Sequence, residues 1–393
     1  MRVAMTRCPE SPDVSRETSQ RWKAGASLRG QRLARGLRLW SLTLLVAAGF
    51  LLTSCVGIAS PEGWASPVAV PGGVLAANED KLLLVDLDSG KAHRLFPPED
   101  GDGEKVNPIA LYGTPAVDDD RAYVPAYDGT LYAVELESQT VAWRLETDGP
   151  LIGGATLSGE TVYVGSSDGK LYAVDAATGK LHWPFQADDE IWSAPAIAGE
   201  VVYVTSLDHR VYSLDAATGQ IRWTFTTAAG VGSPPVVVGE QVFVGSLDSH
   251  MYALDAATGE EVWSFEAGNW FLTRPLVAGG TVYAGSLDHK IYALDAATGE
   301  PRWSPFETEA PVRASPLLAG GVLMVVDREG NLYGLDPSDG AALYGPLLLE
   351  SDVLADPLLV GDEVLVSTTD GKLLRIDPQT GRRLETVDLR ETE

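Results

Sequence analysis

Aspartate and histidine residues recur in the sequence in a pattern that could hold a metal ion. Three pairs follow at 40-residue intervals: Asp208 with His209, Asp248 with His250, and Asp288 with His289. Ligands of one zinc ion must converge, because metal–ligand bonds are about 2 Å long. Pairs at this interval belong to equivalent turns of separate structural units, which we expect to lie too far apart. Histidine also tolerates positive φ, so the pattern predicts turn residues and no metal site.

Other patterns in the sequence offer little catalytic or ligand chemistry. Residues 99–104 read Glu-Asp-Gly-Asp-Gly-Glu, with acidic residues at alternate positions as in calcium loops. Glycine is missing at the sixth position of such a loop and the twelfth falls on Leu111, so we expect a solvated acidic loop, with calcium binding as the alternative. No Gly-x-Ser-x-Gly stands at a strand-to-helix elbow, and no glycine-rich phosphate loop occurs. The sequence therefore predicts no catalytic residues, no cofactor and no enzymatic activity.

Charge and cysteine content exclude several classes of function. The chain has 55 acidic and 29 basic residues, for a net charge of −26. Residues 1–54 hold nine basic and three acidic residues, so the remaining chain holds 20 basic against 52 acidic residues. A body this acidic repels phosphate backbones, which excludes sequence-independent binding of nucleic acid. The only two cysteines, Cys8 and Cys55, form neither a disulfide framework nor a thiolate metal cluster.

Residues 1–54 have the organisation of a signal peptide with a long basic N-terminal region. An uncharged apolar run covers residues 40–52, which is short for a membrane span and typical of a signal-peptide core. The run ends in Leu52-Thr53-Ser54-Cys55, which resembles the lipobox of bacterial lipoproteins. The resemblance implies cleavage before Cys55 and lipidation of Cys55, with residues 55–63 as lipidated N-terminus and tether. A plain cleaved signal or a short anchor remains the alternative.

An internal repeat of about 40 residues fills the rest of the chain. Asp-Ala-Ala-Thr-Gly occurs four times at 40-residue spacing, and degenerate copies extend the series to eight, which start at Asp86, Glu135, Asp175, Asp215, Asp255, Asp295, Asp336 and Asp377. Each unit has four short apolar or alternating segments between Gly and Asp turns, which predicts four antiparallel strands. The chain is therefore predicted to be all-β, an eight-bladed β-propeller of four-stranded antiparallel blades over residues 64–393.

A large aromatic residue follows most of these turns at a fixed distance. Tryptophan stands four residues after the turn glycine or its equivalent at Trp143, Trp183, Trp223, Trp263 and Trp303. One flat side chain at one place in each blade predicts packing between adjacent blades rather than a binding site. Tyr344 and Leu384 stand at or near this place in the last two units, so we expect weaker packing between the last blades.

The repeat resembles that of the pyrroloquinoline-quinone-like propellers, on the motif Tyr-Ala-Val/Leu-Asp-Ala-Ala-Thr-Gly followed by Trp over residues 66–385. One group with this repeat is the quinoprotein dehydrogenases, in which the quinone lies beneath two adjacent cysteines and beside a calcium ion. The chain lacks adjacent cysteines and the long insertions of those enzymes. A second group is the propeller lipoprotein of the outer-membrane β-barrel assembly machinery, which the chain resembles in length, lipobox and unit number.

The second resemblance implies a non-catalytic scaffold that docks protein on the extracytoplasmic side of a bacterial membrane. We expect a monomer held at the membrane by its lipid, without cofactor, with an unidentified protein partner in envelope protein assembly. It would lie on the periplasmic face of the outer membrane, or on the outer face of the plasma membrane where no outer membrane exists. The alternatives are a PQQ-dependent oxidoreductase and a carbohydrate- or peptide-binding propeller.

Bulky residues interrupt the repeat in the loops that join one unit to the next. In an antiparallel meander these loops lie on the face opposite the Asp-Ala-Ala-Thr-Gly turns. Loops on a rigid scaffold commonly carry function, and aromatic and arginine residues dominate protein interfaces. The candidate binding residues around the channel mouth are Trp192, Asn269, Trp270, Phe271, Arg274 and Arg313. The alternative is that these side chains only plug the central channel.

Overall fold

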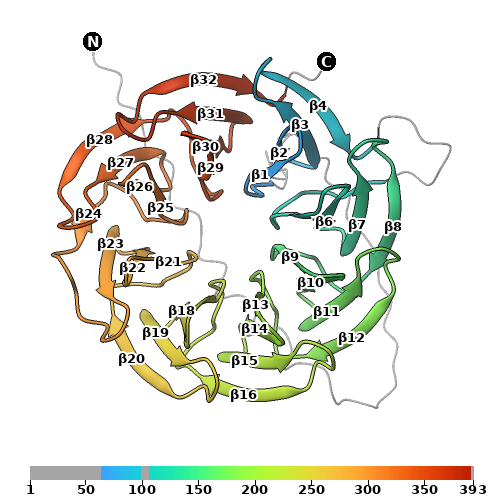
Figure 1. Ribbon diagram of the computed structural model, residues 1–393, viewed down its shortest axis with the longest axis horizontal. Coiled ribbons are helices and arrows are strands. Elements are labelled where there is room, and N and C mark those ends of the chain that lie inside the picture. The colour runs from blue at the N-terminus through green and yellow to red at the C-terminus, as the bar shows by residue number, and fades with distance from the viewer. Residues whose placement is uncertain (1–62, 99–105, 391–393) are drawn as a thin grey trace, which may run out of the picture. The chain divides into compact units, whose positions relative to one another are not determined.

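Thirty-two strands form a ring of eight four-stranded antiparallel sheets in the computed structural model (Figure 1). The structure describes residues 63–98 and 106–390. Each sheet is built from four consecutive strands, numbered here from the channel outward, so the blades follow one another around the ring in chain order. The predicted eight-bladed β-propeller is confirmed.

The strands of the first four blades have these bounds. Blade 1 consists of β1 (Val68–Val70), β2 (Gly73–Asn78), β3 (Lys81–Asp86) and β4 (Lys91–Phe96). Blade 2 consists of β5 (Ala116–Val117), β6 (Arg121–Pro125), β7 (Thr130–Glu135) and β8 (Val141–Glu146). Blade 3 consists of β9 (Ala155–Ser158), β10 (Thr161–Gly165), β11 (Lys170–Asp175) and β12 (Leu181–Gln186). Blade 4 consists of β13 (Ala196–Ala198), β14 (Val201–Ser206), β15 (Arg210–Asp215) and β16 (Ile221–Thr226).

The second half of the ring repeats this organisation. Blade 5 consists of β17 (Val236–Val238), β18 (Gln241–Gly245), β19 (His250–Asp255) and β20 (Glu261–Glu266). Blade 6 consists of β21 (Leu276–Ala278), β22 (Thr281–Ser286), β23 (Lys290–Asp295) and β24 (Phe306–Glu307). Blade 7 consists of β25 (Leu317–Ala319), β26 (Val322–Val326), β27 (Asn331–Leu335) and β28 (Ala342–Leu348). Blade 8 consists of β29 (Leu358–Val360), β30 (Glu363–Thr368), β31 (Lys372–Ile376) and β32 (Arg383–Asp388).

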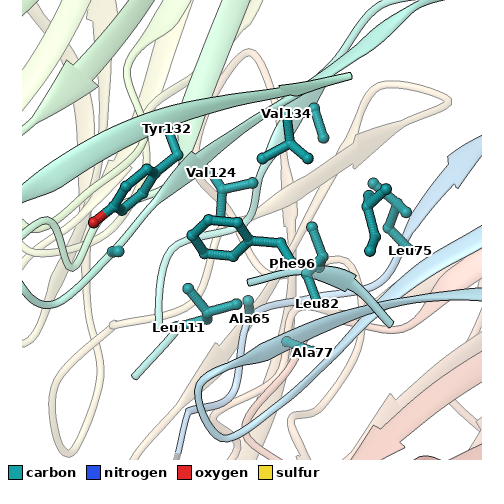
Figure 2. Packing of buried hydrophobic residues seen from close by; sticks show 12 residues of the cluster. Ala65, Leu75, Ala77, Leu82, Phe96, Leu111, Val124, Tyr132 and Val134 are labelled. Atoms are coloured by element: carbon teal, nitrogen blue, oxygen red, sulfur yellow. The ribbon is translucent and has the colours of Figure 1, made fainter. Parts of the chain in front are cut away.

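The core lies between neighbouring blades. The second and third strands of each blade are almost wholly buried, because each of their faces packs against the adjacent blade. Figure 2 shows one such layer between blades 1 and 2, where Leu82, Phe96 and Leu111 meet Val124 and Tyr132. A strand buried on both faces needs apolar residues at consecutive positions, which explains the continuous apolar runs of the repeat.

Each tryptophan of the repeat docks on the next blade. The Trp183 indole N–H donates to the carbonyl oxygen of Ala216 at 3.1 Å, and its ring lies against Gly219. Trp143, Trp223, Trp263 and Trp303 repeat this contact with the following blade. Burial of such a ring contributes several kcal/mol, since truncation of a buried aromatic residue costs about 3–5 kcal/mol. The predicted packing role of these tryptophans is confirmed.

The contacts between blades 7 and 8 and between blades 8 and 1 are made by residues other than tryptophan. Tyr344 replaces tryptophan in blade 7, packs on Gly381 and donates its hydroxyl to the Pro378 carbonyl at 2.8 Å. Between blades 8 and 1, where Leu384 is 39% exposed, the ring closes through a separate apolar cluster that includes Leu365, Leu373 and Val387 of blade 8 with Val74 and Leu83 of blade 1. Unit one therefore belongs to the ring, and hydrophobic burial holds the closure without an exchanged strand.

No helix in the described part of the chain is long and apolar enough to cross a bilayer. The signal peptide of residues 1–54, the lipidated Cys55 and its tether, and the acidic loop of residues 99–104 lie outside the described residues. They remain predictions from the sequence.

Candidate functional site

The two faces of the ring differ in how the chain builds them. The turns between third and fourth strands pair with the turns between first and second strands, as in the bond from Ala256 N to Glu240 O. The inter-blade loops instead pair with the turns between second and third strands, as in the bond from Leu247 N to Gly230 O. We call the face with the inter-blade loops the mouth face and the other the turn face.

The turn face is nearly uniform because the residues of each turn form hydrogen bonds with one another. Asp255 accepts the backbone N–H groups of Ala257 at 3.0 Å and Thr258 at 2.8 Å, and these bonds lower the pKa of its carboxyl. Gly259 closes the turn with φ +75° and donates to the Asp255 carbonyl. A side chain at that position is strained, which explains why glycine ends the repeated string.

Each inter-blade loop sends alternate residues into the central channel. In blade 4, Ile191 and Ser193 are buried, while Trp192 and Ala194 line the cavity. The same alternation recurs in the other blades and gives two rings of lining residues, to which Gly153 and Thr273 add from the positions between them. The first ring is Trp64, Tyr112, Ile152, Trp192, Gly232, Leu272, Arg313 and Leu354, in the order of blades 1 to 8. The second ring is Ser66, Thr114, Gly154, Ala194, Pro234, Arg274, Ser315 and Asp356.

These rings enclose a cavity of about 870 Å³ at the mouth face. Its wall is chemically unequal around the circle. Aromatic side chains come from blades 1, 2 and 4, as Trp64, Tyr112 and Trp192. Cations come from the adjacent blades 6 and 7, as Arg274 and Arg313. A volume in this range and a largely apolar wall with a few polar groups are typical of ligand and partner sites.

Three of the six candidate residues line this cavity and three do not. Trp192, Arg274 and Arg313 belong to the rings. Trp192 is 42% exposed, and its indole N–H donates to the Glu190 carboxylate. These three side chains come together from blades 4, 6 and 7, which lie around one channel in Figure 1.

Asn269 and Trp270 lie on the mouth face outside the cavity lining. The Trp270 carbonyl accepts Leu287 N at 3.0 Å, the contact that joins this loop to its neighbouring turn, and the side chain is 36% exposed. These two residues therefore belong to the rim of the mouth face.

Phe271 is not part of the mouth patch, which corrects the prediction. It is fully buried and lies in the apolar cluster of blades 5 and 6, with its ring 5.8 Å from that of Tyr292. Its place in the loop is that of Ile191 and Val231, so the strict alternation of the loop directs it into the core. The residue that faces the cavity in this blade is Leu272.

Most of the lining residues were not predicted from the sequence, among them Trp64, Tyr112, Leu272, Leu354 and Asp356. A signal for them exists, because the two lining positions stand four and two residues before the first residue of each inner strand in most blades. Reading alternate positions across all eight units, rather than looking for large residues in a few loops, would have found them.

The charged residues of the cavity differ in whether an opposite charge lies near them. Burial raises the pKa of the Asp356 carboxyl, while the hydrogen bond from Ser315 N at 2.7 Å and the charge of Arg274 oppose that rise. Burial also lowers the pKa of the Arg313 guanidinium, and the nearby charge of Arg328 lowers it further. Asp356 therefore has a cation near it, whereas no carboxylate pairs with Arg313 among the described residues.

The Asp–His turns are structural. The Asp208 carboxylate accepts the Tyr212 hydroxyl at 2.5 Å and the backbone N–H of Asp188 at 3.0 Å, so it ties its turn to the adjacent loop. His209 and His289 have positive φ, as predicted, but in the middle pair Ser249 takes that conformation rather than His250. No group of three or more potential metal ligands was found among the described residues.

The cavity does not fit a calcium-bound quinone. Asp356 is the only carboxylate among its lining residues, and that carboxylate already accepts a backbone N–H. Residues 55–393 contain only one cysteine, so the adjacent pair that covers the quinone in the dehydrogenases is absent. We derive no quinone chemistry for this channel.

Comparison with solved structures finds the same architecture elsewhere. BamB from Moraxella catarrhalis matches with a TM-score of 0.62 and 20% identity, over 71% of this chain and 88% of that protein. The computationally designed protein Ika8 matches with a TM-score of 0.68 and 18% identity, over 80% of this chain and 97% of that protein. At these identities the likeness concerns the fold.

Comparison with family models is more specific. No curated protein matches the chain. The model described as outer membrane protein assembly factor BamB matches four overlapping segments, residues 24–154, 137–231, 208–345 and 312–392. These segments cover every blade of the ring. The chain therefore belongs to the PQQ-like propeller family described as outer membrane protein assembly factor BamB.

Proposed function

We propose that this protein is a non-catalytic scaffold, anchored through a lipid on Cys55, that docks a protein partner on its mouth face. The proposal places it on the extracytoplasmic side of a bacterial membrane, in outer-membrane or envelope protein assembly. The family supports the assembly role, and the lipobox at residues 52–55 supports the anchor. A rigid ring of packed blades suits a platform that positions other proteins through its loops.

One observation carries the choice of the mouth face: the repeat is uniform on the turn face and varied around the mouth. Each Asp-Ala-Ala-Thr-Gly turn shows the same small exposed residues, which offer no distinctive contact. The mouth face instead exposes Trp192 and Trp270 with Arg274 and Arg313 nearby in the loops. Exposed tryptophan and arginine are the residues that dominate binding energy at protein interfaces.

The proposed docking can be tested through the positive charges of the mouth face. Arg274 and Arg313 are cations at the centre of a strongly acidic body, so they attract an acidic patch that the rest of the surface repels. Reversal of both, Arg274→Glu with Arg313→Glu, is expected to reduce partner capture from detergent-solubilised membranes, and most at low salt. Quantitative mass spectrometry of the captured proteins measures the loss.

A matched control exists on the turn face. Arg222 and Arg302 pair with Asp215 and Asp295 at 2.7 and 2.8 Å, and their reversal changes the net charge by the same amount. This control is expected to leave capture intact. Equal capture by wild type and the mouth-face double variant, with both folded by thermal melting, would refute docking at the mouth.

A further inference from the structure

The cavity contains a cation with no counter-charge. No hydrogen-bond acceptor or carboxylate pairs with the Arg313 guanidinium in the part of the chain that the structure describes. Arg313 is exposed at the cavity wall, and partial loss of hydration and the nearby charge of Arg328 lower the pKa of its guanidinium. An exposed guanidinium with no counter-charge among the described residues can form a charge-assisted hydrogen bond with an anion that enters the cavity.

The side of the channel opposite Arg313 is apolar and aromatic. In a ring of eight, blade 7 lies across from blade 3, and β25 and β9 face each other across the centre in Figure 1. The first-ring residue of blade 3 is Ile152, and its neighbours in the same ring are Tyr112 and Trp192. A ligand that reaches from Arg313 across the channel therefore meets an apolar and aromatic part of the wall.

The remaining charges limit the ligand to one negative group. Arg274 lies close enough to Asp356 to lower the pKa of that carboxyl, so its charge is already partly balanced. Asp356 itself would repel a second anionic group from the same side of the channel. The cavity therefore has one unbalanced cation beside one carboxylate, within an otherwise largely uncharged wall.

We propose that the channel binds an organic monocarboxylate with an aromatic group, its carboxylate on Arg313 and its ring against Tyr112, Ile152 and Trp192. The guanidinium offers two parallel N–H donors that match a carboxylate, and aromatic faces favour stacking over the ligand ring. This site goes beyond the docking role and does not depend on any protein partner. A free aromatic acid and the C-terminal aromatic residue of a chain share this chemistry.

The test uses four probes on the purified full-length protein in detergent. Ligand-observed NMR measures the affinity of indole-3-propionate, its uncharged amide, and a hexapeptide ending in tryptophan with a free or an amidated C-terminus. The carboxylates are expected to bind at least about tenfold more tightly than their amides, which is the contribution of a charge-assisted hydrogen bond. Tighter binding of the free-ended peptide than of indole-3-propionate identifies a chain end as the source, and the reverse order identifies a free acid.

Variants separate this site from other parts of the surface. Arg313→Gln removes the cation and is expected to weaken carboxylate binding about tenfold or more while leaving amide binding unchanged. Trp192→Ala is expected to weaken both probes of a pair, because it removes apolar contact. Arg222→Gln makes the same charge change on the turn face, next to Asp215, and is expected to leave all affinities unchanged.

Several results would overturn the proposal. Carboxylates and amides that bind equally, or affinities that do not change in the Arg313→Gln variant, would show that Arg313 does not hold the anion. Absence of binding by all four probes at millimolar concentration would show that the channel is not a site for this chemistry. Partner capture by the scaffold is measured separately, so either result leaves the docking proposal standing.

Discussion

Two adjacent aromatic residues, Trp270 and Phe271, are expected to respond in opposite ways to truncation. Phe271 is fully buried between blades 5 and 6, and the backbone of Gly245 lies directly against its Cβ. Phe271→Ala opens a cavity that close neighbours cannot fill, so it should lower the free energy of unfolding by about 3–5 kcal/mol. Trp270 is 36% exposed on the rim, and its loop is held by backbone bonds that Trp270→Ala keeps.

We therefore expect Trp270→Ala to lower the free energy of unfolding by about 1 kcal/mol or less. Urea denaturation followed by circular dichroism, with melting temperatures by calorimetry, measures both variants against wild type. Trp270→Ala should weaken partner capture, since the exposed ring belongs to the mouth face. Strong destabilisation by Trp270→Ala, or a mild effect of Phe271→Ala, would refute the alternation of loop residues from which the cavity is built.

Three other predictions concern the repeat and the anchor. Gly219→Ala should lower the free energy of unfolding, measured by denaturation, by about 2–4 kcal/mol, because the new Cβ would meet the Trp183 ring at 2.5 Å. Gly239 also has positive φ but faces open space, so Gly239→Ala should lower it by only about 1 kcal/mol. Equal costs for the two variants would contradict the packing of tryptophan on glycine. Hydrogen bonds within the turn lower the pKa of Asp255, so the stability that its carboxylate contributes is present above about pH 4 and is lost as pH falls through the folded pKa. The difference in melting temperature between wild type and Asp255→Ala should therefore shrink in acid. A difference that stays constant down to about pH 2.5 would contradict this prediction. Cys55→Ser should release the protein from the membrane fraction or leave it unprocessed, and membrane-bound protein of mature size would disprove lipidation.

The fold could be predicted because the repeat encodes the number of blades, their turns and the packing between them. The spacing of the Asp-Ala-Ala-Thr-Gly turns counts the blades, and each turn follows from local chemistry: a carboxylate that accepts N–H groups and a glycine at positive φ. Trp183 and its equivalents could be assigned to packing because one residue type recurs at one place. Tyr344 was expected to weaken its seam, yet its hydroxyl makes the same kind of bond to the next blade.

The site was harder to predict because it lies where the repeat is broken. By side-chain size alone, Trp192, Trp270 and Phe271 are equally good candidates for binding residues. A shift of one residue along an extended loop, however, reverses the direction of a side chain. That shift places Phe271 in the core and Leu272 in the cavity. Asp356 escaped notice because its relation to Arg274 joins residues 82 positions apart, which only the closed ring brings together.

Site-specific photocrosslinking in intact cells tests the central claim, that the mouth face docks a protein partner. A benzophenone side chain replaces Trp192 on the mouth face in one variant and Ala217, an exposed residue of the turn face, in the other. We predict a discrete crosslinked protein from position 192, weakened by the Arg274→Glu and Arg313→Glu reversals, and none from position 217. Crosslinks from position 217 alone, or from neither position, would contradict docking at the mouth.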